Sequence, residues 1–184
     1  TRYALCMLAG IAAGLVLAGY VVKTAALKSG VSAGPWRSGG DFGSAEAGAL
    51  TRAVIAVHGT LALPATEARY YTAYNDDAGQ PLDGRCSYRL KGGDFAARWW
   101  TLTLYDTAGY LVANEANVYS LRSAQLPTGG WNAVVAPARQ DGAWLPTGGI
   151  ERFSLTLRTY MPADGGRGNL TREQLPSIEA AGCV

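Results

Sequence analysis

Histidine, cysteine and charged residues are all scarce in this sequence. His58 is its only histidine, and its three cysteines form no Cys-x-x-Cys pair, so the usual ligand sets for zinc are missing. Charged residues make up 16% of the chain and the net charge is +2, which argues against a nucleic-acid-binding stripe or an acidic tail. We therefore predict no bound metal, no cofactor and no nucleic-acid partner.

The motifs of common enzyme sites are missing as well. The sequence has no Gly-x-Ser-x-Gly elbow and no glycine-rich phosphate loop before a helix. Aspartates such as Asp76, Asp83 and Asp106 lie in turn sequences, where their side chains accept backbone N–H groups. For His58 we prefer an interaction with the carbonyl groups at a helix end over a role as a base. The sequence predicts no catalytic residue and leaves enzyme activity open.

The residues that are abundant favour β structure. The 184 residues are enough for one domain and an appendage, and 48% of them are hydrophobic, which is enough for a core. The 24 glycines and 10 tyrosines are typical of a turn-rich β architecture.

Residues 3–22 form a run without a charge, between Arg2 and Lys23. As a helix this run is about 30 Å long, the thickness of the hydrocarbon core of a bilayer. We predict a membrane anchor over residues 1–23. A cleaved signal peptide is the alternative, but the apolar run is long and Ala25-Ala26 is a poor cleavage site.

The flanking charges do not favour export, because Lys23, Lys28 and Arg37 follow the anchor and only Arg2 precedes it. A single N-terminal anchor before a cysteine-poor β domain is nevertheless typical of an exported domain. We expect a single-pass protein of the bacterial inner membrane with its domain in the periplasm. Gly10 and Gly14 are small residues four apart, a spacing that lets the anchor pack against the helix of another membrane subunit. The simpler interpretation of this spacing is a generic Ala/Gly-rich anchor without a partner helix.

Between the anchor and the domain, residues 24–43 are rich in Gly, Ser and Lys, and we predict a linker there. Trp36 is an exception in this polar segment. We expect its side chain to dock on its own domain, on a partner or at the membrane interface. Residues 44–57 predict a short helix, with Ser44 as its cap and an apolar stripe at helical spacing. We place one domain, this helix and a β-sandwich, over residues 44–184.

The strongest strand signal is Ala97–Asp106, in which two kinds of side chain alternate. One face is that of a core, and the other is aromatic and hydroxylated, suited to a second layer or a ligand. The core face has Trp100, Leu102 and Leu104, and the other face has Trp99, Thr101, Thr103 and Tyr105. Further strands are predicted at 69–75, 85–90, 110–112, 118–121, 131–135 and 151–160, with a surface tail after Pro162.

Several short motifs occur in an order that resembles the bacterial family called domain of unknown function 1214. They are Tyr70-Tyr71, Leu82-Asp83-Gly84, Tyr88, Trp100-x-Leu-Thr-x-Tyr-Asp106, Gly109, Asn117, Tyr119-Ser120, Trp144-Leu145-Pro146 and Phe153-x-Leu-x-Leu-Arg158-x-Tyr160-x-Pro162. The resemblance covers about residues 65–165 and implies an all-β, antiparallel, jelly-roll-like sandwich. Members often follow a sister domain in larger exported proteins, for which this chain has no room. The family supplies no catalytic residues to transfer.

Cys86 lies early in a predicted strand and Cys183 is the penultimate residue. In an exported domain we expect a disulfide between them, which would hold the C-terminal tail against the sandwich. Cys6 lies in the anchor and is expected to be an unpaired apolar residue.

Arg158 lies within a strand beside Tyr160. We favour a carboxylate such as Asp106 or an aromatic ring as its partner over an anionic ligand.

Three functions remain at this point. The first is a non-catalytic accessory or interaction subunit of a membrane or envelope complex. The second is a small-molecule or glycan-binding module, with Trp99, Tyr105 and Arg158 lining a cleft. The third is a hydrolase of unrecognised type.

Overall fold

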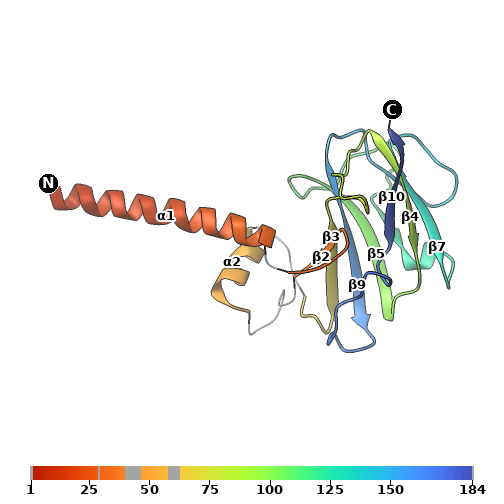
Figure 1. The fold of residues 1–184 in the computed structure, drawn as a ribbon, viewed down its shortest axis with the longest axis horizontal. Coiled ribbons are helices and arrows are strands. Elements are labelled where there is room, and N and C mark those ends of the chain that lie inside the picture. The colour runs from red at the N-terminus through yellow and green to blue at the C-terminus, as the bar shows by residue number, and fades with distance from the viewer. Residues whose placement is uncertain (1, 29, 40–46, 58–62, 184) are drawn as a thin grey trace.

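A computed structural model describes residues 2–28, 30–39, 47–57 and 63–183 of the chain. It shows a long N-terminal helix, a short second helix and a sandwich of two β-sheets (Figure 1). The helices are α1 (Arg2–Lys28) and α2 (Ala49–Val57). The strands are β1 (Val31–Ala33), β2 (Trp36–Ser38), β3 (Ala68–Ala73), β4 (Cys86–Gly92), β5 (Ala97–Asp106), β6 (Ser120–Arg122), β7 (Trp131–Ala136), β8 (Trp144–Pro146), β9 (Phe153–Pro162) and β10 (Ser177–Cys183).

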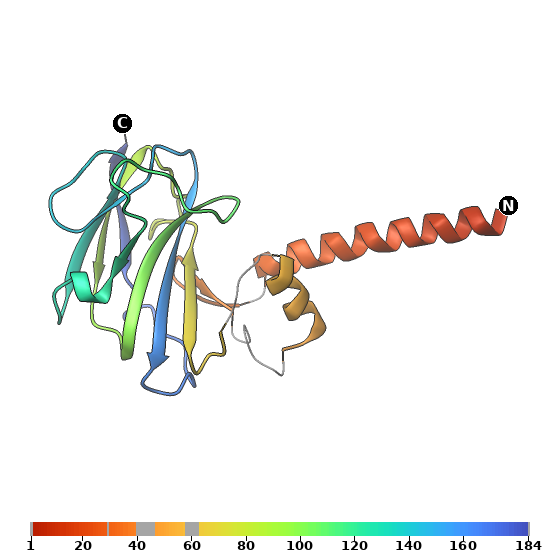
Figure 2. The same cartoon turned by 180° about the vertical axis from the view of Figure 1, so that it is seen from behind.

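One sheet has six strands in the order β1-β2-β3-β9-β5-β6, and the other has four in the order β10-β4-β7-β8. The chain passes repeatedly from one sheet to the other, which gives the predicted sandwich (Figures 1 and 2). Among the described strands, the pairings are antiparallel except that of β7 with β8, which is parallel. The predicted all-β fold is therefore confirmed, with one parallel pair at the edge of the smaller sheet.

The core lies between the sheets, where alternate residues of β5 and β9 meet those of β4 and β7. Leu102 and Leu157 are fully buried and lie opposite each other on neighbouring strands. Trp100 stacks on Trp131 of the other sheet, with ring centroids 5.0 Å apart. This inner side of β5 is the predicted core face.

The structure corrects the predicted linker over residues 24–43. Residues 24–28 continue α1, and residues 31–38 form the β1–β2 hairpin at the edge of the larger sheet. The hairpin joins the sheet through the pairing of β2 with β3. Trp36 holds it in place, because its side chain is fully buried and donates the indole N–H to the Pro176 carbonyl at 2.8 Å. Gly34 makes the hairpin turn with φ of 62°, a left-handed conformation that suits glycine.

Other element boundaries also differ from the predictions. Helix α2 begins at Ala49, and Ser44, the predicted cap, lies outside the described residues. Residues 110–112 contribute only an isolated bridge between Leu111 and Tyr105. The predicted surface tail after Pro162 includes β10, which pairs with β4 over most of its length.

Candidate functional site

The outward side of the six-stranded sheet, called the outer face below, has an unusual set of side chains. The strand pairing places Tyr70, Arg158 and Thr101 in one row across β3, β9 and β5. The next row toward the N-terminal end of β5 pairs Trp99 with Tyr160. In the opposite direction the rows are Thr72-Thr156-Thr103 and Ser154-Tyr105. Aromatic rings, hydroxyl groups and one guanidinium therefore share a single surface.

Arg158 holds the centre of this surface. Its Nη2 donates to the Tyr105 hydroxyl at 2.8 Å, and its guanidinium lies 5.2 Å from the Tyr105 ring centroid and 5.8 Å from that of Tyr70. Such contacts fix a guanidinium in place without neutralising it. No carboxylate in the described residues forms an ion pair with it. Asp106, the expected carboxylate partner, instead accepts the N–H groups of Ala108 and Tyr110.

Trp99 and Tyr160 form an aromatic pair beside Arg158. Their rings stack with centroids 4.7 Å apart, and Trp99 is 39% exposed. Together with Met161 they line a groove of about 500 Å³, whose other lining residues are Leu63, Glu67 and Arg98. Met161 has φ of 50°, a left-handed conformation that is rare for a residue other than glycine, and its side chain is 56% exposed. Strained backbone of this kind is often found at functional sites.

The three residues predicted to bind a ligand thus share the outer face. Arg158 and Tyr105 are in contact, and Trp99 lies one row away. They do not line a cleft between the sheets, because that space is filled by the core. Sequence reasoning missed Tyr70, Tyr160 and Met161. The alternation in Arg158-Thr159-Tyr160 puts Arg158 and Tyr160 on one face, but only the strand pairing places Tyr70 beside them.

A larger hollow of about 1100 Å³ lies between the β1–β2 hairpin and the 74–79 loop. Its acidic groups are engaged in holding the fold together. Asp77 accepts Nη2 of Arg172 at 2.5 Å and the Ile178 N–H at 2.8 Å, and Asp76 accepts the Gln80 N–H at 2.8 Å. The two bonds of Asp77 fasten the C-terminal segment to the body of the sandwich, and that of Asp76 closes its own turn.

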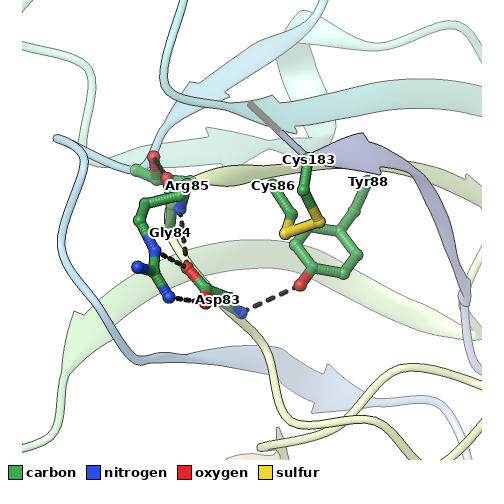
Figure 3. Close-up of a disulfide and its surroundings, with 7 residues drawn as sticks. Asp83, Gly84, Arg85, Cys86, Tyr88 and Cys183 are labelled. Carbon is green, nitrogen blue, oxygen red and sulfur yellow. Dashed lines mark hydrogen bonds and ion pairs between the residues drawn. A yellow bond between two sulfur atoms is a disulfide. The ribbon is translucent and has the colours of Figure 1, made fainter.

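The predicted disulfide is present, and Figure 3 shows Cys86 joined to Cys183. The two cysteines lie directly opposite each other on β4 and β10, so the bond closes the end of the smaller sheet. Cys6 is the free cysteine of the described residues.

The turn before β4 has the most perturbed carboxyl group. Hydrogen bonds from the side chain and backbone of Arg85 hold the pKa of Asp83 well below its usual value (Figure 3). The hydrogen bond to the Asp83 carboxylate in turn raises the pKa of Arg85. Tyr88 accepts the Asp83 N–H at 2.8 Å, and burial raises the pKa of its phenol. The Asp83–Arg85 pair shapes a turn, and such a pair needs no catalytic explanation.

Nothing in the described residues gathers three or more metal-ligating side chains. His58, interpreted above as a helix-end residue, lies outside the described residues. The expectation of no catalytic residue therefore stays an expectation.

Helix α1 is apolar over Arg2–Val22, which is long enough to cross a membrane, and none of this stretch is buried against the rest of the chain. A signal sequence meets the same description. The disulfide is typical of an oxidising compartment.

The fold is similar to that of a solved structure. The VPA0106 protein from Vibrio parahaemolyticus matches with a TM-score of 0.59 and 21% identity, over 74% of this chain and 36% of that one. An uncharacterised protein from Burkholderia cenocepacia matches with a TM-score of 0.41 and 18% identity, over 62% of this chain and 29% of that one. The chain therefore spans about a third of the length of these proteins.

No curated protein matches the chain. A family model does, and it covers residues 67–164, from the start of β3 to the end of β9. This is more than half of the chain, so the protein belongs to the family described as protein of unknown function (DUF1214).

Proposed function

We propose that the protein is a membrane-anchored, non-catalytic accessory subunit of a larger complex in the bacterial envelope. In this proposal α1 crosses the inner membrane once and the sandwich lies in the periplasm. The observation that carries the proposal is the way the helix meets the sheet. Helix α1 ends at Lys28 and β1 begins at Val31, so only two residues separate them.

This short connection supports a fixed position for the sandwich. A flexible linker of twenty residues would let the domain move over about 25 Å. Here the hairpin is part of the sheet and is held by the buried Trp36 side chain. The sandwich is therefore presented close to the membrane surface, as an accessory subunit that contacts its neighbours requires.

The surface of α1 supports a partner within the membrane. Its large apolar side chains are exposed, among them Leu8, Leu15 and Leu17 at 61%, 70% and 63%. Apart from the neighbouring residues and backbone of α1 itself, no atom of the described residues lies within 4 Å of the position that a Cβ would take at Gly10 or Gly14. Two such positions on one helical face allow the backbone of another helix to approach closely. Lipid would cover the remaining apolar surface.

The disulfide supports the periplasmic placement. Disulfides persist in the periplasm and are rare in the cytosol. The positive charges of Lys23 and Lys28 oppose this orientation, since such charges favour the cytoplasmic side. We give the disulfide more weight because it forms within the folded sandwich, on strands β4 and β10.

The test is extraction of the full chain from native membranes in a mild detergent. We expect a membrane protein to co-purify in fixed stoichiometry and to be lost with the Gly10→Ile and Gly14→Ile variants. Gly19→Ile is the matched control, because at about 100° per residue Gly19 lies on the side of the helix opposite Gly10. A monomer in detergent, or loss of the partner with the control variant, would contradict the proposal.

Two further measurements address the anchor and its orientation. We expect the mass of the membrane-bound protein to include α1, whereas a mass lacking it would show that the helix is a cleaved signal. We also expect added protease to digest the sandwich in spheroplasts. Protection of the sandwich there would place it in the cytoplasm and contradict the proposal.

A further inference from the structure

The guanidinium of Arg158 is a half-buried charge without a carboxylate partner in the described part of the chain. A guanidinium has five N–H donors, and within the described residues that of Arg158 forms one hydrogen bond, to the Tyr105 hydroxyl. The two tyrosine rings beside it hold it in position. A preorganised guanidinium with donors to spare is suited to a carboxylate, which it can bind through two parallel hydrogen bonds.

The Trp99–Tyr160 pair next to Arg158 indicates the rest of the ligand. Along β9, Arg158 and Tyr160 are two residues apart on the same face, a separation of about 7 Å. A sugar ring is of similar length, and its C–H groups stack on aromatic rings while its hydroxyls bond to polar groups. The phenol hydroxyls of Tyr70 and Tyr105 accept hydrogen bonds from the Leu63 N–H and from Arg158, and each can still donate one.

We propose that the outer face of the six-stranded sheet binds an acidic saccharide, with a carboxylate at Arg158 and a neighbouring sugar ring on the Trp99–Tyr160 pair. The groove beyond Trp99 is lined by one acidic and one basic side chain, Glu67 and Arg98, so it has no clear preference for an anion. Arg158, which the Tyr105 hydroxyl and two tyrosine rings hold in a fixed position, is therefore the anion position.

The mixture of groups on this face favours a saccharide over other anions. A lipid tail needs a continuous apolar surface, whereas here hydroxylated rows interrupt the rings. A peptide that adds to a sheet uses an edge strand. Arg158 lies on β9, which has β3 on one side and β5 on the other. An open face that alternates rings with polar groups fits a chain of sugars laid across it.

This site does not depend on the accessory role of the protein. The anchor and the outer face are separate parts of the molecule, so either proposal can fail while the other stands.

The test is calorimetric titration of the full chain in zwitterionic nanodiscs with a trisaccharide of galacturonic acid. The neutral galactose trisaccharide of the same linkage is the control ligand. We expect binding of the acidic trisaccharide to be at least about tenfold tighter, the usual effect of one charge-assisted contact. Raising the salt concentration should weaken it.

Four variants locate the site. Arg158→Gln and Trp99→Ala should each weaken binding by about tenfold or more. Arg158→Lys should recover only part of the affinity, because it keeps the charge but loses the planar fork. Arg89→Gln, the same change on an exposed strand position of the other sheet, should bind like the unmodified chain. Circular dichroism confirms that each variant is folded, and Arg158→Lys replaces Arg158→Gln if the latter unfolds.

Several results would overturn the proposal. Absence of binding at millimolar trisaccharide, equal affinity for the neutral sugar, or unchanged affinity in the Arg158 variants would each do so. Tighter binding of triglutamate than of the acidic trisaccharide would assign the face to an acidic protein partner instead.

Discussion

The two sheets of the sandwich share one core but differ on their outward sides. On β4 the outward Arg89 and Lys91 are exposed and alternate with the buried Tyr88 and Leu90, which is ordinary for a sheet with one hydrated face. On β9 the outward Ser154 and Thr156 are each only 8% exposed, although none of the described strands forms a second layer over them. The tall side chains of the same face lie in the rows beside them, and the chain at Leu63 also meets this face through its N–H bond to the Tyr70 hydroxyl.

This difference shows that hydroxyl groups on a strand can be buried for two reasons. A second layer can cover them, or tall neighbours on the same face can shield them. On the outer face Tyr105, Arg158 and Tyr70 surround the shorter threonines. Trp99 and Met161 are exposed at one end of the same face, so the contrast between the two sheets directs attention to binding there.

The largest expected effect is on the edge of the six-stranded sheet. We expect Trp36→Ala to lower the free energy of unfolding by about 3–5 kcal/mol, because it removes a fully buried indole and its hydrogen bond. Ser32→Ala, an exposed position in the same hairpin, should change it by less than about 0.5 kcal/mol. Denaturant titration measures both. A small effect of Trp36→Ala would mean that the hairpin is not part of the sheet.

The next effect concerns the four-stranded sheet, whose edge strand β10 is tied down by the disulfide. We expect the double variant Cys86→Ser/Cys183→Ser to lose about 2–4 kcal/mol, since the bond closes a long loop in the unfolded chain. Cys6→Ser is the control and should have no effect. If the double variant is as stable as the control, β10 is held by Asp77 and by strand pairing alone.

These two regions also show what the sequence could and could not predict. Alternation in residues 97–106 predicted β5 to the residue and identified its core face. The hairpin was missed because three-residue strands are too short for a periodic pattern, and the lone Trp36 was its one signal. Strand β10 was missed because its residues are mostly exposed and its position depends on pairing with β4.

The candidate site was predicted in part for the same physical reason. Residues on one strand can be grouped by their alternation, so Trp99 and Tyr105 were placed together on β5. Which strands lie side by side is a tertiary property, and the row of Tyr70, Arg158 and Thr101 follows only from the order β3-β9-β5. The prediction that Arg158 pairs with an aromatic ring agrees with its contacts to Tyr70 and Tyr105. The role of Arg158 in ligand binding is a proposal.

A matched pair of substitutions tests the contrast between the outward sides directly. Thr156→Gln places a longer side chain under the aromatic groups and removes the hydrogen bond between Thr156 and Thr72, so we expect a loss of about 1–2 kcal/mol. Asn132→Gln, at an exposed outward position of β7, should change stability by less than about 0.5 kcal/mol. Denaturant midpoints compare the two. Equal effects would mean that the outer face is as hydrated as that of the smaller sheet.

The smallest expected effect is the response to acid, and it belongs to the turn that leads into the four-stranded sheet. Hydrogen bonds from Arg85 keep the pKa of Asp83 below its ordinary value of 3.8 in the folded protein. The unfolded chain therefore binds this proton more readily, so the stabilising contribution is complete above about pH 4 and is lost as the pH falls toward the folded pKa. Because the pair is exposed to solvent, the loss is small.

Denaturant midpoints between pH 5 and pH 2.5 measure this loss. Asp83→Asn should flatten the profile most, and Arg85→Gln should flatten it less, because residue 85 keeps the backbone N–H that also lowers the pKa of Asp83. Asp164→Asn should act independently and add to either. In Asp164 the N–H groups of Gly168 and Gly166 lower the pKa, so its loss has the same sign. Arg158→Gln should leave the shape of the profile unchanged, because no carboxylate of the described residues pairs with Arg158. A profile flattened by that variant would reveal an acidic partner of Arg158 on the outer face. The charge of Arg158 would then be satisfied within the protein and would not be available for a ligand.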